Sequence, residues 1–301
     1  MNARFERLSR TASISDLPHC SDSGACAFRL VFAFLAILAG GTLALGTEPP
    51  QGTDEKRDVA RERLKVMTDR MESIVISSDE AAFPKTMQPT PLFRYDDETR
   101  GYVDGTVWRL GKQGRPLAII TAELHPNYLN TGPKVVYDFL SLTERRFTAR
   151  SSDIPGWMPR GSAVTLNSLL GAPAPAKTAA KRLTQIKEQV RRFSGTQDVQ
   201  EIDRSYVQLR LLPREIDRYS PTSDEHSEGA IFIFANGRNP AVLLLIETDG
   251  SDWQYGIGRL SAPSQLEVKL DNTAVWTQPR FESFGNWSDP YTATNVPAEF
   301  P

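Results

Sequence analysis

Apolar side chains recur at intervals of three or four residues in two parts of the chain, and this spacing predicts two amphipathic helices. The first apolar stripe consists of Ala60, Leu64, Met67, Met71 and Ile74, and the second of Leu183, Ile186, Val190 and Phe193. Asp54 and Thr178 precede the two stripes and are residue types that cap helix N-termini. Gly195 is expected to end the second helix, because glycine readily adopts the left-handed conformation found at that position.

Apolar runs with turn signals between them follow each predicted helix and indicate β-hairpins. Residues 106–124 contain a glycine-flanked turn, and residues 230–248 contain the pair Asn236 and Gly237, which is a strong hairpin signal. The second hairpin is apolar on both faces, so we expect it to lie centrally. The first hairpin is expected to keep one solvent-exposed face.

The second half of the chain resembles the first when the sequence is shifted by 124 positions. Six identities fall within 35 residues, where average residue usage gives about two by chance. The identical pairs are Pro89 and Pro213, Arg94 and Arg218, Tyr95 and Tyr219, Gly105 and Gly229, Pro116 and Pro240, and Glu123 and Glu247. The sequence therefore predicts an α+β fold of two tandem repeats, each an amphipathic helix followed by an antiparallel β-meander.

The repeat also predicts the division of the chain after its leader. The first module is expected at 47–170 and the second at 178–285. Residues 171–177, rich in proline and alanine, are predicted to be a linker, because their prolines are incompatible with a helix. Residues 286–301 are rich in Pro, Thr and Asn and are predicted to form an irregular tail.

Residues 1–46 are predicted to be a signal peptide or a signal anchor. The apolar run 30–45 is too short for a comfortable membrane span and has the length of a signal-peptide core. Ala44 and Gly46 are small residues that favour cleavage after Gly46. The long, weakly positive leader is also compatible with an uncleaved anchor, in which case residues 30–45 would be the only membrane contact. Either alternative exports the rest of the chain to the periplasm or the cell surface.

Cysteine usage and charge narrow the functional classes. Cys20 and Cys26 both precede the apolar run, so the exported part contains no cysteine. This excludes disulfides, thiolate metal sites and cysteine nucleophiles from that part. The net charge of the whole chain is −2, which does not favour a nucleic acid partner.

Four stretches resemble a family of exported planctomycete proteins of unassigned function. They read LLPREIDRYS, EGAIFIFANGRNPAVLLLIET, GTVWRLGKQGRPLAIITAEL and PRGSAVTLNSLLGAPAPAKTAAKRLTQIKEQVRRF. The resemblance covers most of residues 54–280 and implies a location in the cell envelope. It implies no activity and supplies no functional residues.

Two histidines follow the leader and were considered as metal ligands. His125 stands two residues after Glu123, so both side chains share one face of a strand, and His226 lies in an acidic segment. Imidazole and carboxylate groups suit zinc or a harder divalent ion. Neither segment has a complete ligand set, so a strand-end histidine and a solvated acidic loop are the favoured interpretations, and no metal or cofactor is predicted.

Catalytic signatures are weak as well. The chain has no G-x-S-x-G motif, although a Ser-His-Asp triad can be assembled from distant residues. Asp96 and Asp97 could act on a glycan, but adjacent residues of an extended segment point to opposite faces, which favours a turn. No catalytic residue is therefore assigned.

The duplicated charges support two interpretations. Arg94 and Glu123 recur as Arg218 and Glu247, each beside apolar strand residues. A charge next to buried residues needs a partner, so we predict that Arg94 pairs with Glu123 and Arg218 with Glu247. The alternative is a symmetric pair of ligand sites.

The sequence as a whole favours a non-enzymatic, exported protein of the cell envelope that acts as a binding or structural module. Its partner is expected to be an envelope macromolecule whose identity the sequence does not indicate. Tryptophans and tyrosines are frequent in the predicted strands and can stack on sugars or peptides. The alternative is a hydrolase acting on an envelope polymer, which predicts His125 or His226 in a pocket beside a serine or a carboxylate.

Overall fold

A computed structural model describes residues 52–80, 83, 86–199, 205–222 and 227–301 of the protein. The predicted apolar run 30–45 and the predicted cleavage site at Gly46 lie outside these residues. Residues 49–301 form one compact unit. Among the described residues, no helix has both the length and the apolar character needed to cross a membrane.

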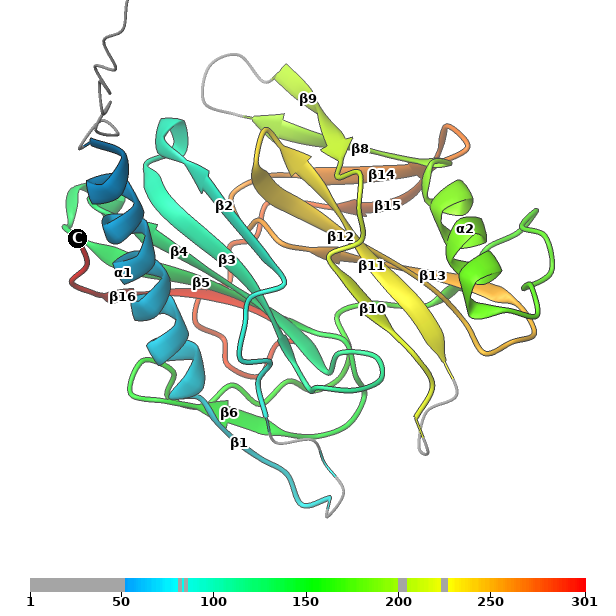
Figure 1. Cartoon of the computed structure of the whole chain (residues 1–301), viewed down its shortest axis with the longest axis horizontal. Coiled ribbons are helices and arrows are strands. Elements are labelled where there is room, and N and C mark those ends of the chain that lie inside the picture. The colour runs from blue at the N-terminus through cyan, green and yellow to red at the C-terminus, as the bar shows by residue number, and fades with distance from the viewer. Residues whose placement is uncertain (1–51, 81–82, 84–85, 200–204, 223–226) are drawn as a thin grey trace, which may run out of the picture. The chain divides into compact units, whose positions relative to one another are not determined.

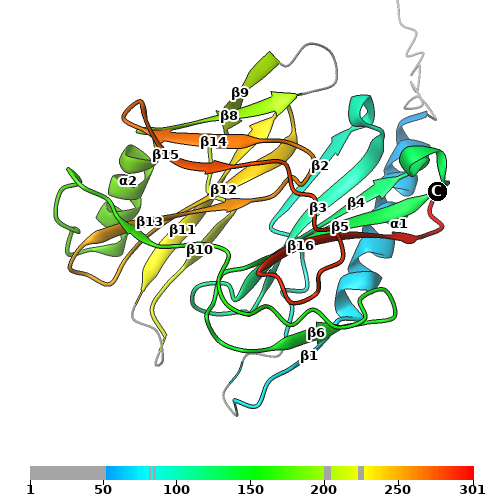
Figure 2. The same cartoon turned by 180° about the vertical axis from the view of Figure 1, so that it is seen from behind.

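The first sheet is antiparallel and has the strand order β16-β5-β4-β3-β2. Its strands in chain order are β2 (Phe93–Asp97), β3 (Tyr102–Leu110), β4 (Ala118–His125), β5 (Lys134–Ser141) and β16 (Tyr291–Pro297). β2 lies at one edge of the sheet and the C-terminal strand β16 at the other. Figure 2 shows β16 alongside β5.

The second sheet has nine strands in the order β15-β14-β8-β9-β11-β12-β13-β7, with β10 also paired to β11. Its strands are β7 (Asn167–Ser168), β8 (Phe193–Val199), β9 (Ser205–Leu211), β10 (Asp217–Tyr219), β11 (Glu228–Asn236), β12 (Asn239–Thr248), β13 (Trp253–Arg259), β14 (Leu266–Leu270) and β15 (Thr273–Gln278). Two further strands, β1 (Val75–Ser77) and β6 (Thr148–Arg150), pair with each other.

Each sheet carries one helix on a face, as the apolar stripes predicted (Figure 1). Helix α1 (Gly52–Glu72) buries Met67 and Met71 in the core on one face of the first sheet. Helix α2 (Ala179–Val190) buries Ile186 and Val190 against the second sheet, and the Thr178 hydroxyl caps its N-terminus by accepting a hydrogen bond from the Lys181 amide. Helix α2 ends before Phe193, which begins strand β8.

A third core joins the two sheets. It contains Val107 and Ile119 of the first sheet together with Ile231 and Leu243 of the second. β3 and β4 are therefore covered by α1 on one face and by the second sheet on the other. The expectation of a solvent-exposed face for the first hairpin is wrong, because the amphipathic helix that precedes the hairpin packs on that face.

The prediction of an α+β fold built from two tandem helix-plus-meander repeats is wrong. The described residues form 16 strands and only two α-helices, so the fold is mostly antiparallel β. The elements also cross the predicted module boundaries. β7 precedes the expected linker but pairs with β13 of the second sheet, and β16 belongs to the expected irregular tail but pairs with β5 of the first. A hairpin of β8 and β9 separates α2 from the second meander. Pairing between distant strands leaves no local pattern in the sequence, so the periodicity did not indicate it.

The two hairpins nevertheless share one register. Gly105 of β3 is paired with Glu123 of β4, and Gly229 of β11 is paired with Glu247 of β12. A tyrosine ring covers each glycine, Tyr95 on Gly105 and Tyr219 on Gly229. The residues that are identical at a spacing of 124 therefore occupy equivalent places in two hairpins that do not belong to tandem modules.

Adding a methyl group at either glycine is expected to destabilise the protein, and more so at Gly229. A Cβ atom on Gly105 would lie 2.6 Å from the Tyr95 ring, whose side chain can shift. A Cβ atom on Gly229 would lie 2.4 Å from the Tyr219 hydroxyl and 2.8 Å from the Cβ of Glu247, which is fixed to the main chain. We expect Gly229→Ala to cost about 2 to 3 kcal/mol and Gly105→Ala about 1 to 2 kcal/mol in urea unfolding. Equal stability of both variants and the native protein would contradict the close packing of these tyrosines.

Candidate functional site

The predicted pair of Arg94 and Glu123 does not form. Arg94 of β2 donates hydrogen bonds to Asp104 of β3 and to the carbonyl of Ala60 in α1. This hydrogen bond to Asp104 raises the pKa of Arg94. Arg94 and Tyr95 are adjacent and point to opposite faces of the sheet, so Arg94 faces α1 while Tyr95 shares the inter-sheet face with Glu123.

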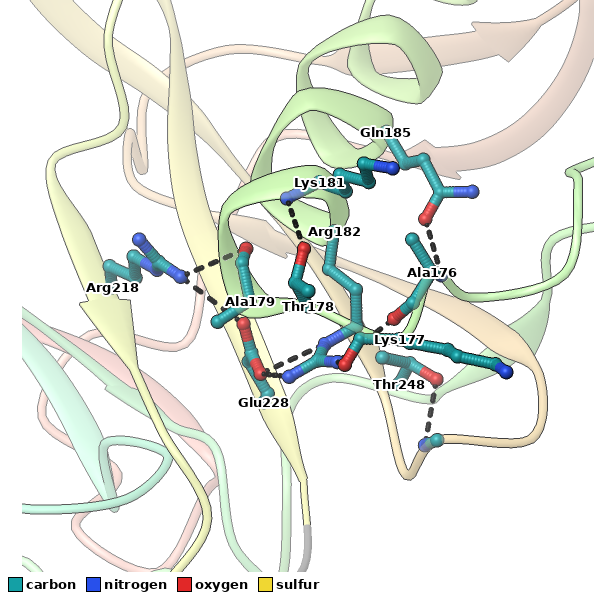
Figure 3. A network of polar contacts seen from close by, with 11 residues as sticks. Ala176, Lys177, Thr178, Ala179, Lys181, Arg182, Gln185, Arg218, Glu228 and Thr248 are labelled. Atoms are coloured by element: carbon teal, nitrogen blue, oxygen red, sulfur yellow. Dashed lines mark hydrogen bonds and ion pairs between the residues drawn. The ribbon is translucent and has the colours of Figure 1, made fainter.

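The predicted pair of Arg218 and Glu247 does not form either. Arg218 donates to Glu228 (3.2 Å) and to the carbonyl of Ala179 (3.3 Å), which repeats the arrangement around Arg94. Glu228 also accepts hydrogen bonds from Arg182 of α2, which in turn donates to the carbonyl of Ala176 (Figure 3). This network attaches the start of α2 and the segment before it to β10 and β11. Its contacts are internal, which is consistent with a structural role.

The two glutamates face the interior between the sheets instead. Glu123 accepts a hydrogen bond from the hydroxyl of Tyr95 (3.0 Å) and lies 3.1 Å from Nε2 of His125. Glu247 accepts from the hydroxyl of Tyr219 (2.5 Å) and from Arg115 (3.1 Å). The partners of the duplicated acids are therefore tyrosines, which the sequence analysis did not consider, although Tyr95 and Tyr219 were among the six identities.

His125 is 9% exposed and lies between the rings of Tyr102 and Tyr128. Glu123 is its carboxylate neighbour, but no serine is among its described contacts and it does not line the groove described below. His226 lies outside the described residues. Asp96 and Asp97 form ion pairs with Arg238 and Arg100. Within the described ranges no three His, Cys, Asp or Glu side chains gather in a way that could hold a metal ion.

A groove of about 1170 Å³ is the best candidate for a ligand site. One wall consists of the first turns of α1 and of β2, from Leu92 to Asp96. The other wall is the segment that connects β9 to β10, from Leu212 to Ile216, together with Arg210 at the end of β9. Arg94, one of the residues predicted as a ligand contact under the alternative interpretation, lines this groove.

Both walls of the groove carry apolar side chains. Leu92, Phe93 and Val103 contribute from β2, the residue before it and β3, and Leu212 and Ile216 from the opposite wall. Leu212 and Ile216 are held against β11, because their amides donate to the carbonyls of Ile233 (2.9 Å) and Ile231 (2.8 Å). The opposite wall is therefore a fixed surface and not a free loop.

The charges of the groove are distributed unevenly between its walls. Three of the lining carboxylates have cationic partners, which are Asp104 with Arg94, Asp96 with Arg238, and Glu215 with Lys187. Arg210 and Arg214 of the β9–β10 wall are exposed and have no carboxylate partner among the described residues; Arg210 donates only to the carbonyl of Gly237 (3.2 Å). The β9–β10 wall therefore presents two guanidinium groups to the groove.

The α1–β2 wall is mixed. Lys56, Glu55 and Glu98 lie on it, and none of them has an ion pair to a described residue. Lys56 and Glu55 are neighbours on the helix, so their charges largely offset each other. Arg63 also lines this wall and donates to the carbonyl of Pro301 (2.7 Å). The charged residues of the β9–β10 wall are Arg210, Arg214 and the Lys187-paired Glu215, so this wall is the more positive of the two.

Arg210 and Arg214 were not predicted from the sequence. Arg214 lies in the stretch LLPREIDRYS and Arg210 directly precedes it, but a local pattern does not show which arginines lack a carboxylate partner. Asp104 and Glu228 were also missed, although they are separated by the same 124 positions and are both acidic. This match at a spacing of 124 could have identified Asp104 and Glu228 as the partners of the two duplicated arginines.

Comparison of the chain with family models, curated proteins and solved structures finds no match to any of them. The resemblance to exported planctomycete proteins therefore stays a prediction. The groove, its charges and its position in the fold carry the functional argument.

Proposed function

We propose that the protein is a binding protein of the cell envelope and that the groove between β2 and the β9–β10 wall takes an anionic part of an envelope macromolecule. One observation carries the proposal: a groove of about 1170 Å³, lined by apolar and charged side chains, holds two guanidinium groups, Arg210 and Arg214, that no carboxylate of the described residues neutralises. Planar guanidinium groups are well suited to carboxylate and phosphate ligands.

The internal contacts favour binding without chemistry at this site. The lining acids Asp104 and Asp96 are held by arginines in ion pairs, so their carboxylates are engaged in contacts within the protein. The groove combines apolar side chains with a few charged groups, which is typical of binding sites. Export of the chain, predicted from residues 30–45, would place the groove in contact with envelope polymers.

The proposal predicts that reversing the two groove charges abolishes most binding to the envelope. The full-length protein with Arg210→Glu and Arg214→Glu is expected to bind isolated cell envelopes at least 10-fold more weakly than the native protein, because two attractions become repulsions. Native binding is expected to weaken with rising salt. Co-sedimentation isotherms at several salt concentrations measure both effects.

A matched control separates the groove from net charge. Arg146 and Arg160 are exposed arginines outside the groove and have no described side-chain contacts. The variant Arg146→Glu, Arg160→Glu changes the net charge by the same amount and is expected to bind as the native protein does. Equal loss in both variants would assign the effect to net charge and would contradict a groove site.

A further inference from the structure

We infer that the occupant of the groove is an extended polypeptide segment, with apolar and acidic residues in alternation, that adds to the free edge of β2 as a further strand. This inference rests on the proposed function, since it names the ligand class of the same groove. It depends on three features of the described chain: the unpaired edge of β2, the apolar side chains that line the groove, and the two arginines Arg210 and Arg214.

The first feature is the edge of β2. Among the described strands β2 pairs only with β3, so the row of main-chain groups on its other side has no strand partner. The residues of β2 and the one before it, from Leu92 to Asp96, line the groove. An unpaired strand edge is a template for another extended segment, and main-chain hydrogen bonds supply the affinity in such strand addition.

The second feature is the alternation that the groove would select. Successive side chains of a strand point to opposite faces, so every second residue of an added strand would face the α1 side of the groove, which is lined by the apolar side chains of Val59, Ala60 and Val103. The other residues would face the β9–β10 wall. The side chains of the added strand that face this apolar surface on the α1 side are therefore expected to be apolar.

The third feature predicts the charge of the remaining side chains of the added strand. Arg210 and Arg214 lie on the wall opposite β2, and both are exposed and free of carboxylate partners among the described residues. Carboxylates on alternate residues of the added strand would complement them, whereas lysines there would be repelled. An acidic polysaccharide could satisfy the arginines, but it would not continue the regular ladder of main-chain hydrogen bonds at the edge of β2.

The test uses a synthetic peptide of seven residues, Glu-Val-Glu-Val-Glu-Val-Glu with blocked ends, and the full-length protein. Fluorescence anisotropy of the labelled peptide is expected to show saturable binding. A peptide with lysine in place of glutamate is expected to bind at least 30-fold more weakly. A peptide of the same sequence with an N-methyl group on every main-chain amide of its seven residues keeps its charge but cannot donate those hydrogen bonds in either strand direction, and is expected to bind at least 10-fold more weakly.

Hydrogen exchange locates the bound strand. Amides in 92–97 are expected to exchange at least 10-fold more slowly with the peptide bound, while amides of β15, an edge strand of the other sheet, are expected to be unchanged. Equal binding of the N-methylated peptide, or unchanged exchange in 92–97, would overturn strand addition and leave the groove proposal standing. Binding of polygalacturonate in preference to the acidic peptide would overturn the polypeptide assignment. Failure of the Arg210→Glu, Arg214→Glu variant to weaken envelope binding would instead overturn the proposed function.

Discussion

Replacing Arg109 by alanine is expected to lower the free energy of unfolding by about 3 to 5 kcal/mol, because it leaves the carboxylate of Asp217 buried without its cation. Arg109 of β3 and Asp217 of β10 join the two sheets at 2.5 Å, and their side chains are only 5% and 10% exposed. Arg109 also donates to the carbonyls of Gly111 and Gly114, each at 2.7 Å, and so holds the turn of the first hairpin.

The expected loss corresponds to a decrease of roughly 10 °C in the melting temperature for a domain of this size. Burial lowers the pKa of Arg109 and raises the pKa of Asp217, which shows that desolvation disfavours both charges. The attraction between the two groups offsets part of this cost. The double variant Arg109→Ala, Asp217→Asn is therefore expected to recover part of the loss, because the unpaired charge is gone.

A second inter-sheet ion pair provides the control. Arg238 and Asp96 also connect the second sheet to β2, but their side chains are 68% and 49% exposed. Arg238→Ala is expected to leave the free energy of unfolding nearly unchanged, because solvent screens an exposed ion pair. Urea unfolding of the three variants measures these differences. A small effect of Arg109→Ala, comparable with that of Arg238→Ala, would show that the pair does not join the sheets as described.

Stability is expected to fall as pH rises from about 4 to about 7, with Asp138 as one cause. Asp138 of β5 is buried between the sheets and accepts hydrogen bonds from the Tyr291 hydroxyl of β16 and from Thr121 (3.1 Å). Burial, followed by the nearby charge of Glu123, raises the pKa of Asp138 to about 7. In the unfolded chain an aspartate has a pKa of about 3.9.

The sign follows from proton binding. Between these two pKa values the folded protein keeps a proton that the unfolded chain has released, so the unfolded state is favoured as pH rises through this window. A shift of this size corresponds to at most about 4 kcal/mol, lost by about pH 7 and constant above it. Asp138→Asn has no charge to bury and retains an oxygen that accepts from Tyr291.

We therefore compare the free energy of unfolding of Asp138→Asn with that of the native protein at two pH values. The difference is expected to shift in favour of the variant by about 2 to 4 kcal/mol between pH 5 and pH 8. Urea unfolding of both proteins at several pH values tests this, and other titrating groups cancel in the comparison. Parallel pH profiles of the two proteins would assign the proton to another group.

Local features of the fold were predicted well and distant ones were not. Both amphipathic helices and both hairpins follow from spacing and turn residues, since these depend on neighbours in the chain. The second helix was predicted to include Phe193, which instead begins β8. Pairing with β9 and β14 overrides the helical periodicity there.

The candidate site was predicted only in part. Arg94 was recognised as a charge that needs a partner, but the choice of Glu123 failed because alternation along β2 places Arg94 and Tyr95 on opposite faces. Arg210 and Arg214 are notable only because no described carboxylate pairs with them, and this property depends on residues far away in the sequence. Spacing alone does not show it.

Protection of Lys56 by the envelope ligand is the most direct measurement of whether the groove is the binding site. Lys56 lines the groove and is exposed, while Lys112, in the turn of the first hairpin, is exposed outside it. The full-length protein is treated with an amine-acetylating reagent with and without saturating cell envelopes, and modification of each lysine is followed by mass spectrometry. Acetylation of Lys56 is expected to slow several-fold while that of Lys112 is unchanged. Equal rates at both lysines with and without bound envelope would contradict the assignment of the groove as the ligand site.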